Sequence, residues 1–502
     1  MNPSPAVPQH RAFVIRTRIE EVTGQSERTI LLGGVLLLTA VSAAMGYVLA
    51  QFFGVDVSTS LLHPPEDCFG RWGTNIGRHC FSDYAMVVGA GTRGNPWQPY
   101  PMLEPHPTLR LGYPAAGILP QLLFGVPAKW LGIPFLGLFG YELALSVAVF
   151  SPAIWAARGT QGLERVVVFV ALGAAAIPAW ATIDRGNSVG FVVPLALAFL
   201  VALRRQRWRC VTVMVILASL VKPQFAVLVV ALFTARQWRM GGFGVAGIAV
   251  ANFAAYLLWP RHFPATITQS VHNLFGTSGL YLTDLRNVSF GRAILLVPDY
   301  FKLLQTGKIP DSFLAGPRAL IGYGVLTVIV ACMLGLGRRI APVMSGIVLL
   351  ATATLFPPLA LFYYLVFVLP VAALIVRDPN GPPGAGIFDN PEALGGRRRK
   401  AGIWMSLATA LAIAQIALPG PIMNIAIPGQ TVTRGVVGTT VFITPFLWLV
   451  ACATIIISYA RRPASVLGDG RKPAVPDVDS WAASDSPGTN ESVADVHEKE
   501  TR

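Results

Sequence analysis

Residues 80–114, CFSDYAMVVGAGTRGNPWQPYPMLEPHPTLRLGYP, form a polar segment rich in Pro and Gly within a chain that is otherwise mostly apolar. The segment follows the first hydrophobic run and carries an acidic residue, Asp83, beside an aromatic one, Tyr84. A membrane protein tolerates such irregular backbone only where protein or water satisfies its polar groups. We therefore predict a long ordered loop near a bilayer surface and take it as the first candidate for a functional site.

The composition is that of a membrane protein. Of the 502 residues, 53% are hydrophobic and only 13% are charged, whereas a soluble domain is about 25% charged. The formal net charge is +14, but the basic residues cluster at the ends of apolar runs, as the positive-inside rule predicts. The charge therefore indicates membrane orientation and argues against a nucleic-acid partner.

The apolar runs predict an all-α polytopic membrane protein with about ten to twelve transmembrane helices. Most of them approach the ~20 residues that an ~30 Å hydrocarbon core requires. The predicted spans are 30–54, 134–156, 165–183, 188–203, 243–259, 316–337, 340–356, 359–376, 403–418 and 436–460.

Two further apolar runs do not fit a simple crossing. Residues 113–131 contain two prolines, which bend helices, and the charge balance around them predicts a re-entrant or interfacial segment. Residues 210–235 have basic clusters on both sides and Lys222-Pro223 near the middle. We predict two half-helices that enter from the cytoplasm and meet at this dipeptide.

Charge alternation predicts the organisation of the chain. Residues 1–29 form a cytoplasmic segment, 30–460 a transmembrane domain, and 461–502 a disordered tail rich in Asp, Glu, Ser and Pro. Because about thirty polar residues precede the first apolar run, we expect no cleavable signal peptide. Large loops at about 55–112 and 260–315 face outward, which predicts a protein of the cytoplasmic (inner) membrane with an extracytoplasmic site.

The five cysteines are scattered. Cys68 and Cys80 share the first outer loop, where a disulfide between them fits an oxidising compartment, and the sequence leaves open whether they are bonded. Cys210, Cys332 and Cys452 lie in or beside apolar runs, which predicts inert packing. No zinc-binding pattern occurs, and we predict neither a metal nor a cofactor.

Asp83 is the best candidate for a general base. Removing a proton from a hydroxyl group requires a carboxylate near the reacting atom, with a pKa adjusted by its surroundings. The alternative is a structural role, since Ser82-Asp83 could cap a short helix. Asp56, Asp67 and Glu104 are rival carboxylates in the same loop.

Other polar residues have both functional and structural interpretations. His106 lies in a rigid Pro-His-Pro turn, and His272 and Arg286 could bind an anion or lie at the interface. Lys222 is the most unusual charge, because a lysine inside an apolar run is a functional hypothesis by default. Glu142 has the same status and is one possible partner for Lys222.

The sequence lacks a Gly-rich phosphate loop and a nucleotide fingerprint. With an outward-facing site, this absence disfavours a nucleotide-sugar or ATP-driven enzyme and favours a donor carried by the membrane itself.

Several short motifs resemble those of glycosyltransferase family 87, multi-spanning enzymes of the type-C fold that use polyprenyl-phosphate-linked sugars. The resemblance extends over roughly residues 30–376 and lies in Asp83-Tyr84, Gly89 to Gly94, Tyr113-Pro114, Gly186-Asn187, the basic turn 204–209, Lys222-Pro223, residues 236–239, and Asn287 with Ser289.

Within that family the chain looks most like the actinobacterial α-(1→3)-arabinofuranosyltransferase branch. Pro105-His106 precedes Tyr113, and a late span carries Tyr363-Tyr364 where the mannosyltransferase branch more often has histidine. The chain departs from the pattern in a longer stretch between His106 and Tyr113 and in a single Pro114.

The resemblance implies an inverting transfer of arabinofuranose or mannose from a polyprenyl-phosphate donor to a cell-envelope glycan or glycolipid, with Asp83 as the base. The residues expected to bind or support the substrates are Tyr84, His106, Asn187, Lys222, His272, Arg286, Asn287, Tyr363 and Tyr364. His272 and Arg286 are the candidates for stabilising the leaving phosphate.

Two alternatives belong to other classes of protein. One is a transporter or flippase of a lipid-linked sugar, with Lys222 and Glu142 as a coupling pair; the lack of an internal repeat counts mildly against it. The other is a scaffold that has lost catalysis.

Overall fold

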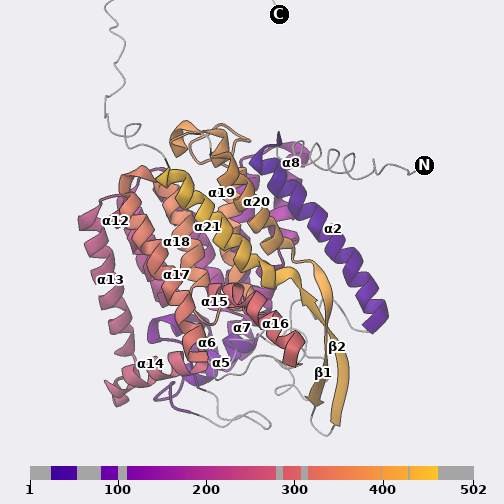
Figure 1. Ribbon diagram of the computed structural model, residues 1–502. Coiled ribbons are helices and arrows are strands. Elements are labelled where there is room, and N and C mark those ends of the chain that lie inside the picture. The colour runs from indigo at the N-terminus through magenta and orange to yellow at the C-terminus, as the bar shows by residue number, and fades with distance from the viewer. Residues whose placement is uncertain are drawn as a thin grey trace, which may run out of the picture. The chain divides into compact units, whose positions relative to one another are not determined.

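The structure, a computed structural model, describes residues 24–53, 81–99, 110–278, 286–306, 315–396, 398–427 and 430–461. The chain divides into two units, Met1–Arg462 and Pro463–Arg502. The second unit lies outside the described residues. The first is mostly helical, and in Figure 1 its helices α2, α20 and α21 run side by side.

Four helices in the described part of the chain are long and apolar enough to cross a membrane. They are α2 (Glu27–Phe53), α7 (Pro134–Ala157), α17 (Ala315–Leu336) and α21 (Thr444–Ala460). A fifth candidate is a bent pair, in which α8 (Gly162–Phe169) with its π-helical continuation η2 (Val170–Ala174) meets α9 (Ile177–Arg185) at 48°. The coarse prediction of a mostly helical, multi-pass membrane protein is therefore confirmed.

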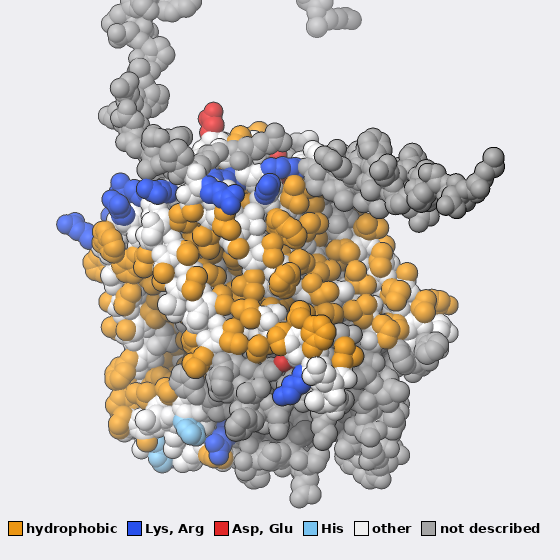
Figure 2. Space-filling model, viewed as in Figure 1, with side chains coloured by type: hydrophobic (Ala, Val, Ile, Leu, Met, Phe, Trp, Pro, Cys, Tyr) orange, Lys and Arg blue, Asp and Glu red, His pale blue; other side chains and the backbone are white. Residues whose placement is uncertain are grey.

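The surface agrees with this conclusion. Figure 2 shows apolar side chains spread over a broad belt of one face, with Lys and Arg side chains gathered along its upper edge. An apolar belt bounded by basic residues is the pattern expected of helix ends at one side of a bilayer.

Shorter helices occupy most of the other predicted spans. They are α10 (Val192–Arg204) after the 3-10 turn η3 (Ser188–Phe191), α11 (Trp208–Val221), η4 (Pro223–Val229) with α12 (Val230–Thr234), α13 (Trp238–Tyr256), α18 (Pro342–Leu355), η8 (Phe362–Phe367) with α19 (Val368–Val376), and α20 (Arg399–Ala414). Most of them fall short of the ~20 residues of a straight crossing, so the number of crossings stays a prediction.

The helix break predicted at Lys222-Pro223 lies between α11 and η4. Lys222 has an extended backbone (φ −146°, ψ 114°), and the next helical segment begins at Pro223. The proline ring disfavours a helical conformation in the residue before it, which accounts for the position of the break. The membrane side from which the two arms enter stays a prediction.

The polar segment after the first span is partly helical. Residues Ser82–Gly91 form α5, and Ala115–Trp130 form α6, a continuous helix that keeps Pro120 and Pro127 inside it. Helix α6 packs against α5, α7 and α11. Whether residues 113–131 are re-entrant or interfacial stays a prediction.

The two predicted outer loops pack on each other. The second contains α14 (Ala265–Ser278), α15 (Phe290–Ile294) and α16 (Leu296–Thr306). From α14, Asn273 Nδ2 donates to the carbonyl oxygen of Trp97 at 2.9 Å, and Gln269 Oε1 accepts from Asn95 Nδ2 at 2.7 Å. The first loop is thus held by the polar face of a helix from the second.

A two-stranded antiparallel hairpin departs from the all-α prediction. Strands β1 (Ala417–Ile427) and β2 (Gln430–Thr439) pair from Ala417↔Thr439 to Ile427↔Gln430, with a register shift between Pro419 and Ile422. The segment is rich in Thr, Val and Ile, whose branched side chains favour strands over helices. The apolar content of the segment alone did not predict the two strands.

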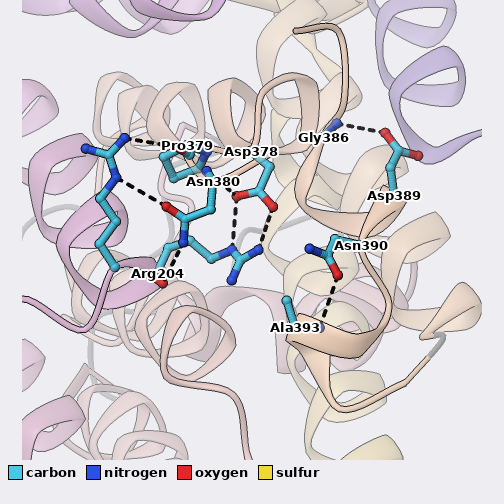
Figure 3. Close-up of polar contacts among 9 residues, drawn as sticks. Arg204, Asp378, Pro379, Asn380, Gly386, Asp389, Asn390 and Ala393 are labelled. Atoms are coloured by element: carbon cyan, nitrogen blue, oxygen red, sulfur yellow. Dashed lines mark hydrogen bonds and ion pairs between the residues drawn. The ribbon is translucent and has the colours of Figure 1, made fainter. Parts of the chain in front are cut away.

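A compact loop follows α19 and is tied to the end of α10 (Figure 3). Asp378 accepts hydrogen bonds from Arg204 Nε at 3.0 Å and Arg204 Nη2 at 2.6 Å, and its side chain is fully buried. The Asp378 carboxylate also accepts from the backbone N–H of Asn380 at 3.1 Å. Farther along the loop, Asp389 accepts from the backbone N–H of Gly386 at 2.7 Å.

We predict that Asp378→Ala destabilises the folded protein by about 3–5 kcal/mol, because it leaves the Arg204 guanidinium buried without its counter-charge. Asp389→Ala is the matched control, since it removes an exposed carboxylate from the same loop. Thermal unfolding of both variants in detergent checks this. Equal stabilities of the two variants would contradict it.

Candidate functional site

Asp83 lies in the first turn of α5 and is 5% exposed. It does not cap its own helix, because the start of α5 has no side-chain cap. Its Oδ2 accepts a hydrogen bond from Asn187 Nδ2 at 2.6 Å, and its Oδ1 lies 3.4 Å from Arg185 Nη2. A buried carboxylate is stable only when it is paired and hydrogen-bonded, and these two groups meet that requirement.

The last residue of α9, Arg185, and the turn that follows the helix present both partners of Asp83. Gly186 adopts a left-handed conformation (φ 61°) that ends the helix, and its carbonyl oxygen accepts from Tyr141 Oη at 2.9 Å. Asn187 Oδ1 accepts from the backbone N–H of Val189 at 2.9 Å and so caps η3. The side-chain amide of Asn187 is thereby oriented with its Nδ2 toward Asp83.

Tyr113 connects this carboxylate to the buried lysine. Asn187 Nδ2 also donates to Tyr113 Oη at 3.2 Å, and Lys222 Nζ lies 3.9 Å from the centre of the Tyr113 ring. Burial, and next the Asp83 carboxylate, raises the pKa of the Tyr113 hydroxyl well above its ordinary value, so this hydroxyl stays protonated. The residues Asp83, Asn187, Tyr113 and Lys222 are called here the Asp–Lys cluster.

Among the described residues, the Lys222 amine contacts the rings of Tyr113 and Tyr364. It is 3% exposed, its Nζ also lies 5.6 Å from the Tyr364 ring, and it forms no hydrogen bond in the described part of the chain. A cation over aromatic faces is stabilised by the ring quadrupole, but the Lys222 amine has no hydrogen-bond acceptor among the described residues. The amine can therefore bind an anionic ligand.

The paired tyrosines predicted from the sequence close one side of the cluster. The Tyr363 and Tyr364 rings stack at 5.1 Å, and Arg185 Cζ lies 5.4 Å from the Tyr363 ring. The carbonyl oxygen of Tyr363 accepts from Thr182 Oγ1 at 3.1 Å. The tyrosines thus contact both cations of the site.

Asn287 supports the tyrosines from outside the cluster. Its Oδ1 accepts from the backbone N–H groups of Ser289 and Ala360, at 3.0 and 3.2 Å, and its Nδ2 donates to the Pro358 carbonyl at 2.8 Å. The Ser289 hydroxyl caps α15. The predicted Asn-x-Ser pattern therefore fixes the backbone just before Tyr363.

Tyr84 and Glu142 lie beside Gly186, since a Cβ added there would meet Glu142 Oε1 and Tyr84 Cβ. The Tyr84 ring packs 4.8 Å from the Tyr141 ring. Both Glu142 carboxylate oxygens are buried without a hydrogen-bond partner among the described residues, and so is Lys222 Nζ. The expected Lys222–Glu142 pair is therefore not formed.

Two further predicted residues, His272 and Arg286, belong to the second loop. His272 lies on an exposed face of α14, and Arg286 is the half-buried residue before Asn287. Three predicted residues lie outside the described residues, namely Cys68, Cys80 and His106. The three rival carboxylates Asp56, Asp67 and Glu104 lie outside them as well.

Arg185, Tyr113 and Tyr141 are site residues to which the sequence assigned no role. A signal existed for the first, because Arg185 is a charge at the end of an apolar helix beside a Gly-Asn turn. Tyr141 carried none, since an aromatic residue in an apolar span looks like ordinary core.

The site offers a buried carboxylate, an unbonded ammonium and several tyrosine hydroxyls. It can remove a proton at Asp83 and bind an anion at Lys222. Over the described ranges, no group of three His, Cys, Asp or Glu side chains could hold a metal ion.

Comparisons of the chain with protein-family models, curated proteins and solved structures find no match.

We predict that Gly186→Ala disrupts the site. An added Cβ would lie 2.9 Å from Glu142 Oε1 and 3.0 Å from Tyr84 Cβ. Gly132→Ala is the matched control, because Gly132 is also left-handed (φ 71°) but has nothing within 4 Å.

Both variants carry the conformational cost of about 1–2 kcal/mol for a left-handed residue, and only Gly186→Ala adds a collision. Unfolding of both proteins in detergent measures the difference. Equal losses of stability would show that the close packing around Gly186 does not matter.

Proposed function

We propose that the protein is a polyprenyl-phosphate-sugar-dependent glycosyltransferase of the cytoplasmic membrane. It moves arabinofuranose or mannose to a cell-envelope glycan or glycolipid on the extracytoplasmic side. In this proposal the fold is the type-C transferase fold with about ten to twelve crossings. The observation that carries the proposal is the Asp–Lys cluster, which brings a buried base and an unbonded buried cation to one tyrosine.

The proposed reaction is an inverting displacement. The acceptor hydroxyl oxygen attacks the anomeric carbon, Asp83 takes the hydroxyl proton, and the bond between that carbon and the phosphate oxygen breaks. Polyprenyl phosphate leaves with the electron pair. Asn187 and Arg185 hold the Asp83 carboxylate in a fixed position, and a general base must lie within hydrogen-bond reach of the proton that it removes.

Lys222 replaces His272 and Arg286 as the proposed ligand of the phosphate. It belongs to the same buried cluster as Asp83, whereas His272 is exposed on α14. Preorganised positive charge in a dry site stabilises a leaving group more than the same charge in water. Because the lysine is buried, we expect it to act in this way.

The runner-up is a transporter of a lipid-linked sugar. The observation in its favour is that Glu142 and Lys222 are both buried without hydrogen bonds, as two groups that exchange protons or ligands could be. It predicts movement of the lipid between leaflets with no new glycosidic bond.

In the experiment, purified protein in nanodiscs is incubated with radiolabelled polyprenyl-phosphate arabinose or with radiolabelled polyprenyl-phosphate mannose. Each donor is combined with a panel of oligosaccharide acceptors. We predict product from one donor, and a loss of roughly 10²–10⁴-fold in Asp83→Asn, the usual contribution of a general base. Asp389→Asn, at an exposed carboxylate, is the control and keeps wild-type turnover. Normal turnover by folded Asp83→Asn would contradict the assignment of Asp83 as the base. Movement of the lipid between leaflets without product would favour the transporter.

A second prediction concerns Lys222→Met. Methionine fills similar volume without charge, so the folded protein should lose no stability, since a buried unpaired charge is itself costly. Affinity for polyprenyl phosphate should fall roughly 10- to 100-fold, the value of hydrogen bonds to a charged group.

Titration of polyprenyl phosphate into nanodisc-embedded protein measures this affinity. Lys129→Met, at an exposed lysine, serves as the control. Unchanged affinity in Lys222→Met would remove the lysine from the phosphate site.

A further inference from the structure

Gln121 is a buried polar side chain that the proposed chemistry does not use. It lies inside α6, it is fully buried, and neither Oε1 nor Nε2 forms a hydrogen bond within the described ranges. A buried amide without partners is destabilising, and such a group in a native structure requires an explanation. Leucine would fill the same position in an apolar helix at no such cost.

The position of Gln121 links it to the Asp–Lys cluster. Gly117 lies one helical turn earlier, on the same face of α6. A Cβ on Gly117 would lie 3.2 Å from the carbonyl oxygen of Val221, the residue before Lys222. Gln121 is therefore on the side of α6 that packs against α11 near the helix break.

Ser188 is a second side chain of the same kind. It is fully buried, and its Oγ has no hydrogen-bond partner among the described residues. It follows Asn187, whose amide holds Asp83, and it begins η3. Since η3 contacts both α6 and α11, these two unbonded side chains come from elements that pack together beside the base.

We propose that Gln121 and Ser188 form the subsite that recognises hydroxyl groups of the transferred sugar. The inference rests on the proposed function. An amide supplies one acceptor oxygen and two N–H donors, and a serine hydroxyl both donates and accepts. Sugar hydroxyls also donate and accept, so they can satisfy both side chains at once. A site built to hydrogen-bond a hydroxyl strongly rejects an analogue that lacks it, which makes these residues determinants of sugar specificity.

The test compares binding of the parent polyprenyl-phosphate sugar with binding of analogues in which single hydroxyls are replaced by hydrogen. Wild-type protein, Gln121→Leu and Ser188→Ala are each measured in nanodiscs, together with Thr444→Val. Thr444 is the matched control, because its hydroxyl is also fully buried and unbonded but lies at the start of α21.

Wild type and Thr444→Val should bind at least one deoxy analogue at least about tenfold more weakly than the parent sugar. Gln121→Leu or Ser188→Ala should bring that ratio close to one for a particular hydroxyl. Unfolding measurements accompany each variant, since a role in holding an internal water would change stability and leave the ratio as in wild type. That result overturns the inference.

Transfer assays on the same proteins separate the two proposals. If wild type binds the sugar with the predicted discrimination but forms no product, the transferase assignment fails and the subsite stands. If wild type forms product while both variants keep wild-type discrimination, the subsite fails and the transferase assignment stands.

Discussion

The charge of Asp83 has to be compensated inside an apolar helical bundle, and the arrangement of the site follows from that requirement. An unpaired buried carboxylate costs several kcal/mol, so the fold must bring it an amide and a guanidinium. Arg185, at the end of α9, and Asn187, in the turn after it, do so. The same amide reaches Tyr113, whose ring carries Lys222. Asp83 and Lys222 are thus buried a few side chains apart, and Asp83 pairs with Arg185 rather than with Lys222.

Breaks in the helices provide the polar groups that this arrangement requires. Gly186 ends α9 in a left-handed conformation, and Lys222 interrupts the path from α11 to η4. In a membrane protein, irregular backbone is tolerated where it is enclosed by protein or lines a watery site. Gly186 and Pro223 therefore determine where the helices break and where the polar side chains of the site lie. The long apolar helices surround these breaks.

The sequence predicted the positions of the helices better than the contacts between side chains in the site. Apolar runs located most of the helices, and Pro223 located the break at Lys222, because both signals are local. The partners of Asp83 could not be read in this way, since Asn187 lies 104 residues farther along the chain and only tertiary packing joins them. The hairpin formed by β1 and β2 was missed because most of it lies between two predicted spans, 403–418 and 436–460, and the search for long apolar runs does not detect strands. The expected Lys222–Glu142 pair is not formed.

The most direct measurement is an experimental structure of the protein in a nanodisc with bound polyprenyl phosphate. The account predicts a phosphate oxygen within about 3 Å of Lys222 Nζ, the distance of a charge-assisted hydrogen bond, with Asp83 still bonded to Asn187. A phosphate bound instead beside His272 or Arg286, with Lys222 left on the Tyr113 ring, would contradict it.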